Sequence, residues 1–251
     1  MSVFLVIYAY HETEDSKKNL DFFLRHAVFD LPDIDYIIVS QTAFPTVEIP
    51  NFSNVKLIKK DKNEGLDFGA WSVGLREVEL GKYEKFIFLN DTVRGPFFPP
   101  FVKDDLIGRW YQIFCRKLNE RIKLVGVTVN NMTSFRMLSR HVQSMAFCTD
   151  SVGLRLLLAA GLFDYKTCVR LSKDKEIFVE KREIYMSEII LKNKFEIDEL
   201  YVRESQIDDD IHFLDNGDRR LNPLEVMFIK TNRIDSPELR EYTNWYDSTV
   251  S

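Results

Sequence analysis

Polar residues that could bind a cation or a phosphate stand directly after an apolar run in the first half of the chain. Asn90, Asp91 and Thr92 follow the run KFIFL, and a Gly-Pro pair comes soon afterwards. A carboxylate at the end of a buried strand offers hard oxygen ligands to a divalent cation, which could bridge the phosphates of a nucleotide. Asn, Asp and Thr also begin turns, so these three residues on their own favour a turn.

A second group of such residues lies shortly before that run, in NEGLDFGAW, residues 63–71. Gly65 allows a ligand to approach the backbone closely, and the amides that begin the following helix could face a phosphate or a ribose. Asp67 could accept a hydrogen bond from a sugar or a base, and Asn63 opens the segment. The segment matches neither the GxGxxG nor the Walker pattern, so its spacing alone indicates nucleotide binding only weakly.

The elements around both groups alternate between strands and helices. Runs rich in β-branched and aromatic residues predict strands, and apolar residues at helical spacing predict helices, the first of them with Ser16 as a possible cap. Strands are expected at 3–10, 36–40, 55–60, 85–89, 122–129, 142–149 and 195–202, and helices at 16–29, 68–80, 104–121, 151–163 and 183–194. This order predicts an α/β fold, a three-layer α/β/α sandwich with a mostly parallel central sheet. Such sheets bind ligands at the carboxyl ends of their strands, where Asn90 to Thr92 stand.

The composition narrows the class of protein further. A chain of 251 residues, 45% of them hydrophobic, is long enough for one large α/β domain. We expect a single domain over 1–251, with a nucleotide-binding half at about 1–101, an acceptor-side half at about 102–230 and a C-terminal extension at about 231–251. The chain could also be part of a longer multidomain protein.

The charge of the chain argues against several kinds of partner, and its cysteines indicate the compartment. The net charge is −5 and Lys and Arg are spread along the chain, which argues against nucleic acid or a membrane surface as partner. Cys115, Cys148 and Cys168 are far apart and odd in number, so we expect no disulfide framework and no zinc site, and a reducing compartment. The apolar run at 3–10 is too short to span a bilayer and has no leader features. We therefore expect a cytoplasmic protein without a transmembrane segment.

Several segments, taken in order, resemble a known class of enzyme. They are NEGLDFGAW, FIFLNDTVRGPFFPPF, LVGVTVN, HVQSMAFCTD and EIYMSEIILKNKFEI, which together cover roughly 63–202, with RRLNPLEVMFIKTNR near the end. The chain resembles the nucleotide-sugar glycosyltransferases of the GT-A class, and more narrowly the rhamnan-synthesis-F-like and related eukaryotic and algal-virus sequences. The resemblance implies a GT-A fold that transfers a sugar from a UDP-, GDP- or TDP-linked donor to a glycan acceptor.

The resemblance also implies roles for individual residues. Asn90, Asp91 and Thr92 stand where the family has its Asp-x-Asp metal motif, so Asp91 would bind Mn²⁺ or Mg²⁺, although it is the only carboxylate left there. Arg94 would place positive charge near the diphosphate, and a surface salt bridge is an equally good interpretation of it. His212, in DDDIH, would complete the metal site from the C-terminal side, although a solvated acidic loop is the simpler interpretation.

Two further sets of residues would act on the acceptor side. Glu183 and Glu188 are candidates for the base that deprotonates the attacking hydroxyl in an inverting transfer. Glu183 ranks first because it forms a Glu-x-x-x-Ser pattern with Ser187, whereas Glu188 fits a solvated helix face better. His141 and Gln143 offer hydrogen-bond donors to an acceptor sugar, although a lone histidine beside an apolar strand is more often structural. The three tryptophans are interpreted as core residues rather than sugar-stacking platforms: Trp71, Trp110 and Trp245.

Two other classes of function are alternatives to the glycosyltransferase. An inactive GT-A-like module that binds a nucleotide or a glycan is suggested by the reduced acidic motif. A dehydrogenase or a nucleotidyltransferase is disfavoured, because HETED follows the first strand where a glycine fingerprint or a basic phosphate-binding loop would be needed.

Overall fold

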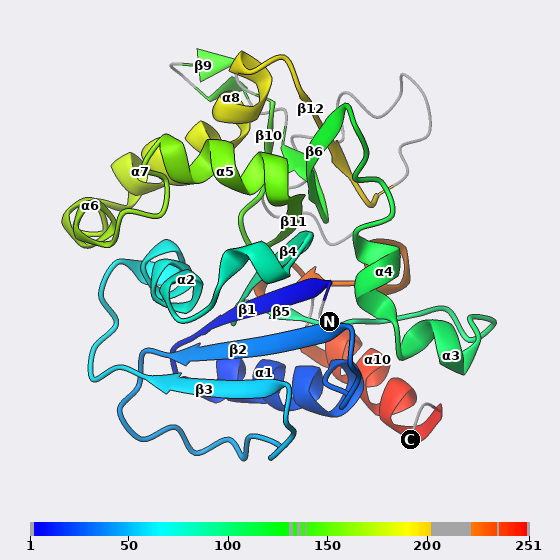
Figure 1. Ribbon diagram of the computed structural model, residues 1–251. Coiled ribbons are helices and arrows are strands. Elements are labelled where there is room, and N and C mark those ends of the chain that lie inside the picture. Colours follow the sequence, from blue (N-terminus) through cyan, green and yellow to red (C-terminus); the bar gives the residue numbers. More distant parts are fainter. Residues whose placement is uncertain are drawn as a thin grey trace.

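A seven-stranded sheet forms the centre of the molecule (Figure 1). The computed structural model describes residues 3–130, 133–134, 137–138, 140–201, 222–234 and 236–249. The strand order is β12-β6-β11-β4-β1-β2-β3. The strands are β1 (Phe4–Tyr10), β2 (Ile34–Ser40), β3 (Val55–Lys59), β4 (Lys85–Asn90), β6 (Ile122–Gly126), β11 (Ala146–Asp150) and β12 (Glu196–Glu199).

The sheet is parallel except for one strand. β1 pairs in parallel with both β2 and β4, β2 pairs in parallel with β3, and β6 pairs in parallel with β12. β11 lies between β4 and β6 and is antiparallel to both. The prediction of an α/β fold with a mostly parallel central sheet is therefore confirmed.

The two faces of the sheet are buried in two separate hydrophobic clusters, which make the three layers. Along β1, Phe4, Val6 and Tyr8 pack into one cluster, and Leu5 and Ile7 pack into the other, as alternation along a strand requires. The first cluster includes residues of α1 (Glu14–Ala27), α4 (Trp110–Phe114), α9 (Pro223–Val226) and α10 (Ser236–Thr249). The second includes residues of α2 (Leu66–Arg76), α5 (Ser151–Ala159), α6 (Tyr165–Leu171), α7 (Lys175–Phe178) and α8 (Tyr185–Lys192).

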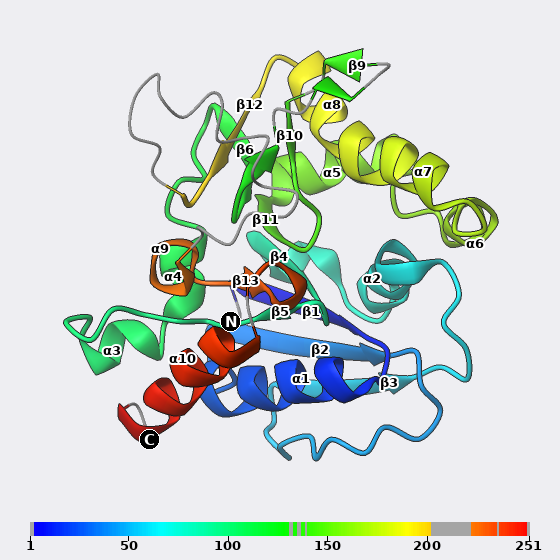
Figure 2. The same ribbon diagram turned by 180° about the vertical axis from the view of Figure 1, so that it is seen from behind.

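The C-terminal helix α10 packs into the main body of the fold. Figure 2 shows it beside α1 on the face of the sheet opposite to α2. Its Tyr246 is fully buried, in ring contact with Phe22 of α1 and with Phe97. Segment 231–249 thus contributes to the same core as the first strand.

The first helix begins earlier than the sequence suggested. Thr13 is the N-cap of α1 and accepts a hydrogen bond from the Ser16 amide, while the Ser16 hydroxyl accepts one from the Thr13 amide at 2.6 Å. This is a capping box, so Ser16 occupies its third helical position and Thr13 is the cap. The prediction that Ser16 caps the helix was wrong by three residues.

Two other predicted helices differ from their expected form. The expected helix at 104–121 consists of α3 (Asp104–Ile107) and α4, which are separated at Gly108 and Arg109, and Arg109 has non-helical backbone angles. Glycine has low helix propensity, which explains a break at this point. The expected helix at 183–194 begins as α8 only at Tyr185, and a π-helical segment, Val179–Ile184, precedes it.

Short elements and loops complete the described part of the chain. Three two-stranded sheets pair β5 (Val93–Arg94) with β13 (Ile229–Lys230), β7 (Val129–Asn130) with β10 (His141–Val142), and β8 (Thr133–Ser134) with β9 (Met137–Leu138). Two 3-10 helices span Leu80–Lys82 and Thr231–Arg233. Trp71 and Trp110 are fully buried and Trp245 packs against the first cluster, as expected of core residues.

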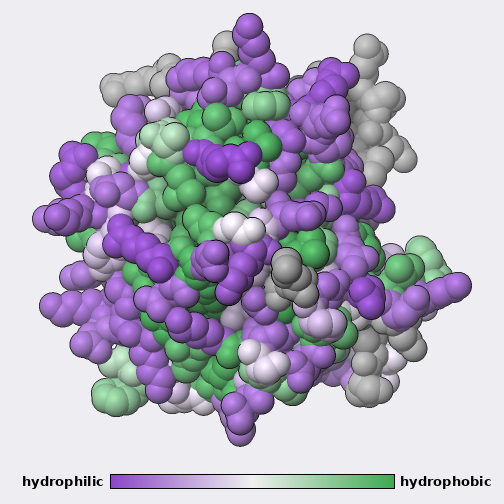
Figure 3. Space-filling model, in the orientation of Figure 1, coloured by the Kyte–Doolittle hydropathy of each residue, from purple (hydrophilic) through white to green (hydrophobic). Residues whose placement is uncertain are grey.

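Figure 3 shows many hydrophilic side chains on one face of the molecule, with hydrophobic residues visible between them. The most exposed large hydrophobic side chains in the described ranges are Phe44 and Phe101. Within those ranges, no helix is long and apolar enough to cross a membrane.

Candidate functional site

The candidate site lies where the strand order of the sheet reverses. β1 lies between β4 on one side and β2 on the other, and the chain reaches β4 only after β2 and β3, so a switch point exists between β1 and β4. His11 directly follows β1, and Asp91 directly follows β4. The His11 amide donates to Asp91 Oδ2 at 2.5 Å. Ligands of open parallel sheets bind outside the carboxyl ends of the strands at such a point.

The turn that follows β4 holds Asp91 in place. The Asn90 Oδ1 atom accepts from both the amide and the hydroxyl of Thr92, at 3.1 and 2.6 Å. Asn19 of α1 donates to the main-chain carbonyl of Asp91 at 2.9 Å. Asn90, Asp91 and Thr92 therefore form a turn, as their residue types favour, and this turn leaves the Asp91 carboxylate partly accessible.

Asp67 reaches the same region from the start of α2. Gly65 has φ of +78°, and a Cβ atom there would lie 3.0 Å from the Gly69 Cα, so this position needs glycine for close packing. Leu66 also has positive φ, 51°, an uncommon conformation for a residue with a bulky side chain. Buried Gln41 donates to the Leu66 carbonyl at 3.1 Å and supports this backbone. The chain then places Asp67 Oδ2 3.0 Å from Asn90 Nδ2.

The carboxyl groups at this edge of the sheet have raised pKa values. Burial is the main cause that raises the pKa of Asp67 to about 6, and the negative charge of Glu183 adds to it. Burial likewise raises the pKa of Asp91 to about 6, with a contribution from the charge of Asp67 and an opposing one from the His11 amide. Asp67 and Asp91 therefore influence each other electrostatically, and carboxyl groups with raised pKa values are typical of sites that transfer protons or bind cations.

Glu183 holds the segment that leads into β11. Its Oε2 atom accepts from the Ser144 amide at 2.7 Å and from the Ser144 hydroxyl, and its Oε1 atom lies 3.8 Å from His141 Nε2. One turn later, the Ser187 hydroxyl accepts from the Val142 amide at 2.9 Å. The Glu-x-x-x-Ser pattern thus anchors residues 141–144. The Glu183 side chain remains 20% exposed, so its carboxylate is not sealed off from solvent.

Glu188 lies apart from this group. It forms an i, i+4 ion pair with Lys192 at 2.7 Å, and its side chain is 28% exposed. This is the solvated helix face that its sequence position favoured. Its contacts give no support to a role as the base.

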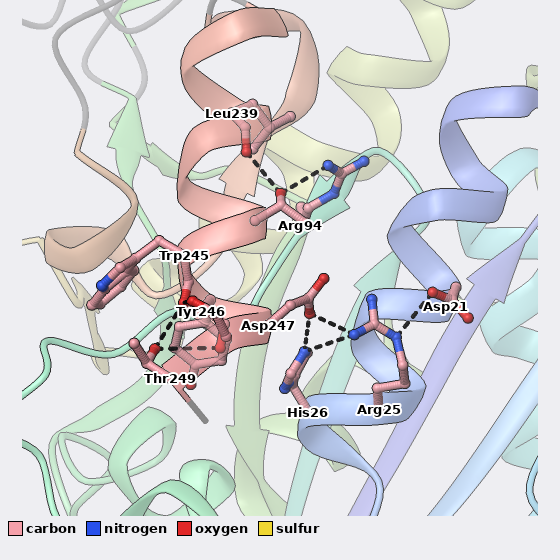
Figure 4. Close-up of polar contacts among 11 residues, drawn as sticks. Asp21, Arg25, His26, Arg94, Leu239, Trp245, Tyr246, Asp247 and Thr249 are labelled. Atoms are coloured by element: carbon pink, nitrogen blue, oxygen red, sulfur yellow. Dashed lines mark hydrogen bonds and ion pairs between the residues drawn. The ribbon is translucent and has the colours of Figure 1, made fainter. Parts of the chain in front are cut away.

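Arg94 is buried rather than exposed at the surface. The residue is 7% exposed, and its Nε donates to Asn19 Oδ1 at 3.0 Å. Its Nη1 donates to Thr243 Oγ1 at 3.1 Å, and Figure 4 shows the Arg94 guanidinium turned toward α10. Burial lowers the pKa of Arg94 from its ordinary value. The expected surface salt bridge was wrong because β5 turns the side chain inward between α1 and α10. The predicted role of Arg94 beside a diphosphate stays a prediction.

The remaining predicted residues lie in different environments. Asn63 is exposed on the loop before α2. His141 and Gln143 are each 5% exposed, and the Thr128 hydroxyl donates to Gln143 Oε1 at 2.6 Å, so burial does not favour direct contact with an acceptor. His212 and the rest of DDDIH lie outside the described residues.

The described residues do not form a metal site by themselves. In the ranges that the structure covers, no three His, Cys, Asp or Glu side chains are grouped so that they could hold a metal ion. Asp91 and Asp67 are half-buried residues, and their two carboxylates do not supply a complete donor set. The predicted binding of Mn²⁺ or Mg²⁺ at Asp91 stays a prediction.

Three residues of the site were not found from the sequence: His11, Asn19 and Gln41. His11 had a usable signal, because it follows the first strand of a predicted parallel sheet and such positions meet at one edge. Asn19 and Gln41 act through main-chain carbonyls that are distant in sequence, and no local pattern indicates such contacts.

Comparisons with known proteins add no relative of established function. No protein-family model matches the chain, and no curated protein is significantly similar to it in sequence.

Proposed function

We propose that this chain is a glycosyltransferase that moves a sugar from a nucleotide diphosphate donor to a hydroxyl group of a glycan. The observation that carries the proposal is the bond between the His11 amide and Asp91, which places a carboxylate of raised pKa at the switch point of the sheet. The order of motifs shared with GT-A enzymes supports the same conclusion. An α/β fold alone would support many other chemistries.

The reaction assigns separate roles to the carboxylates. The acceptor oxygen attacks the anomeric carbon, the bond from that carbon to the diphosphate oxygen breaks, and a base takes the hydroxyl proton. Glu183 is the proposed base, because Ser144 fixes its Oε2 atom while the side chain stays partly exposed. Inversion at the anomeric carbon follows from direct attack. Asp67 and Asp91 are proposed to face the donor from the edges of α2 and β4.

The donor and the metal are tested together. Purified protein is screened with UDP-, GDP- and TDP-linked sugars, with and without manganese, and both thermal shift and donor hydrolysis are measured. We expect one donor to raise the melting temperature and to be turned over. Asp91→Asn should abolish turnover, because the variant keeps an oxygen acceptor for the His11 amide and loses only the charge.

Glu188→Gln is the matched control for Asp91→Asn. It also removes one carboxylate charge, but from an i, i+4 ion pair with exposed Lys192, and such surface pairs contribute little to stability. Turnover by Glu188→Gln should equal that of the wild type. Equal activity in Asp91→Asn and the wild type would contradict the placement of Asp91 in the site.

Glu183→Gln distinguishes a role of Glu183 as the base from a role in donor binding or in the fold. Glutamine keeps an oxygen that can accept from the Ser144 amide, so donor affinity should stay within about twofold while turnover falls at least about 100-fold, the typical contribution of a general base. Isothermal titration with the donor and steady-state rates measure the two quantities. Loss of donor binding in this variant would assign Glu183 to the donor pocket or to the fold instead.

An inactive nucleotide- or glycan-binding module is the second candidate. The single carboxylate in the Asn90 to Thr92 motif, together with the incomplete metal site among the described residues, favours it. Donor binding without turnover of any sugar would support this candidate.

A cytoplasmic location also stays a prediction. It agrees with the free, buried state of Cys115, Cys148 and Cys168.

A further inference from the structure

The C-terminal helix α10 is attached to the body of the fold through one face. Tyr246 is buried between aromatic rings, and Asp247 lies 2.6 Å from His26 Nε2 and also accepts from Arg25 Nη1 (Figure 4). Thr243 lies one turn before Asp247 on the same face and contacts Arg94. Among the residues that the structure describes, α10 is held by polar anchors at Asp247 and Thr243, and the anchor at Thr243 leads toward the candidate site.

The anchor at Thr243 is the first link of a chain of hydrogen bonds. The Thr243 hydroxyl donates to the Leu239 carbonyl at 2.7 Å, so its oxygen is left to accept from Arg94 Nη1 at 3.1 Å. Arg94 Nε donates to Asn19 Oδ1 at 3.0 Å. Asn19 Nδ2 then donates to the main-chain carbonyl of Asp91 at 2.9 Å. The chain is continuous from the C-terminal helix to the turn that carries Asp91.

Burial makes the hydrogen bonds of Arg94 and Asn19 difficult to replace. Arg94 is 7% exposed and Asn19 is 1% exposed, so water has little access to their polar atoms. If Thr243 loses its oxygen, the Arg94 Nη1 group loses a partner in a buried environment, which costs more than the loss of an exposed hydrogen bond. The guanidinium group must then shift, and Asn19 Oδ1 loses the donor that fixes its amide plane.

We propose that α10 positions Asp91 through Thr243, Arg94 and Asn19, which are positioning residues for the site. Thr243 is then the residue of α10 that supports the site, and Arg94 acts through the Asp91 turn rather than on a ligand. The positioning of Asp91 is inferred from these contacts alone. The expected effect on turnover rests on the proposed function.

Hydrogen exchange of the His11 amide tests the positioning of Asp91, because this amide donates to Asp91 Oδ2. In Thr243→Val, which keeps the shape of the side chain without the hydroxyl, His11 exchange should become about tenfold faster well below the melting temperature. Thr243→Ser restores the hydroxyl and should restore slow exchange. Asp247→Asn weakens the other anchor and should leave His11 exchange within about twofold of the wild type, whatever it does to the melting temperature.

Turnover measured on the same variants tests the link to the proposed function. We expect Thr243→Val to lower kcat about tenfold, with recovery in Thr243→Ser and little change in Asp247→Asn. His11 exchange that is equal in Thr243→Val and the wild type, or equally fast in Thr243→Val and Asp247→Asn, overturns the inference. Fast exchange in Thr243→Val alone, in a protein that turns over no nucleotide sugar, supports the positioning chain and contradicts the proposed function instead.

Discussion

At the scale of residues, the site is defined by two carboxyl groups, Asp67 and Asp91, whose pKa values are raised. The sequence indicated Asp67 and Asp91 as candidates because each stands beside a predicted element end, and the structure places Asn90 between them. The sequence did not indicate that Glu183 raises the pKa of Asp67, because that effect depends on distance between segments more than 100 residues apart. Environment rather than residue type gives these carboxylates their properties.

Replacement of Asp67 with asparagine should stabilise the protein at neutral pH. The folded state protonates Asp67 at a pKa of about 6, whereas an unfolded aspartate has a pKa of about 3.9. Between these values the folded state binds more protons, so the free energy of unfolding falls as pH rises through this window, and the loss persists at pH 7.5. We expect Asp67→Asn to increase the free energy of unfolding by about 1–2 kcal/mol at pH 7.5.

The sign of this effect is checked by denaturation across pH. At pH 4 the wild-type carboxyl is largely protonated in the folded state, so the difference between Asp67→Asn and the wild type should shrink toward zero. A variant that is less stable than the wild type at pH 7.5, or a difference that does not change between pH 4 and 7.5, would show that burial of the Asp67 charge carries no cost.

At the scale of elements, three strands were predicted closely. The second strand, the third strand and β4 lie within about two residues of their predicted bounds, because each is a run rich in β-branched and apolar residues. The strands expected at 122–129 and 142–149 are shorter, since β6 ends at Gly126 and β11 begins at Ala146. The helix expected at 104–121 is broken at Gly108, and α2 begins two residues before its predicted start, at Leu66. Tertiary packing around glycines decides these bounds, and the packing partners are distant in sequence.

Gly74 shows how closely α2 packs on the sheet. A Cβ atom at this position would lie 2.6 Å from the Ile7 Cγ2 atom of β1. Alanine favours a helix over glycine by roughly 1 kcal/mol, but overpacking a core costs about 1–3 kcal/mol. We expect Gly74→Ala to lower the free energy of unfolding, measured in urea, by up to about 2 kcal/mol.

Gly81 provides the control for Gly74. A Cβ atom at Gly81 would have no heavy atom within 4 Å, so Gly81→Ala should change the free energy of unfolding by less than about 0.5 kcal/mol. If Gly74→Ala is as stable as Gly81→Ala, then α2 can move relative to β1 without cost. In that case the position of Asp67 is not set by helix packing.

At the scale of the whole molecule, the order of strands creates the site. The alternation of strands and helices predicted a mostly parallel sheet, but it did not predict that β11 inserts antiparallel between β4 and β6. It also did not predict that α10 lies beside α1 and connects to the Asp91 turn, since both arrangements depend on contacts far apart in sequence. The site therefore joins the first strand, the middle of the chain and the C-terminal helix.

Donor hydrolysis by the wild type, Asp91→Asn and Glu188→Gln is the measurement that tests the central claim most directly. The panel contains UDP-, GDP- and TDP-linked sugars with and without manganese, and free nucleoside diphosphate is the measured product. We predict that one donor is hydrolysed by the wild type and by Glu188→Gln and not by Asp91→Asn. Hydrolysis of no donor by the wild type, without a shift of the melting temperature by any of them, would contradict the claim that this edge of the sheet binds nucleotide sugars.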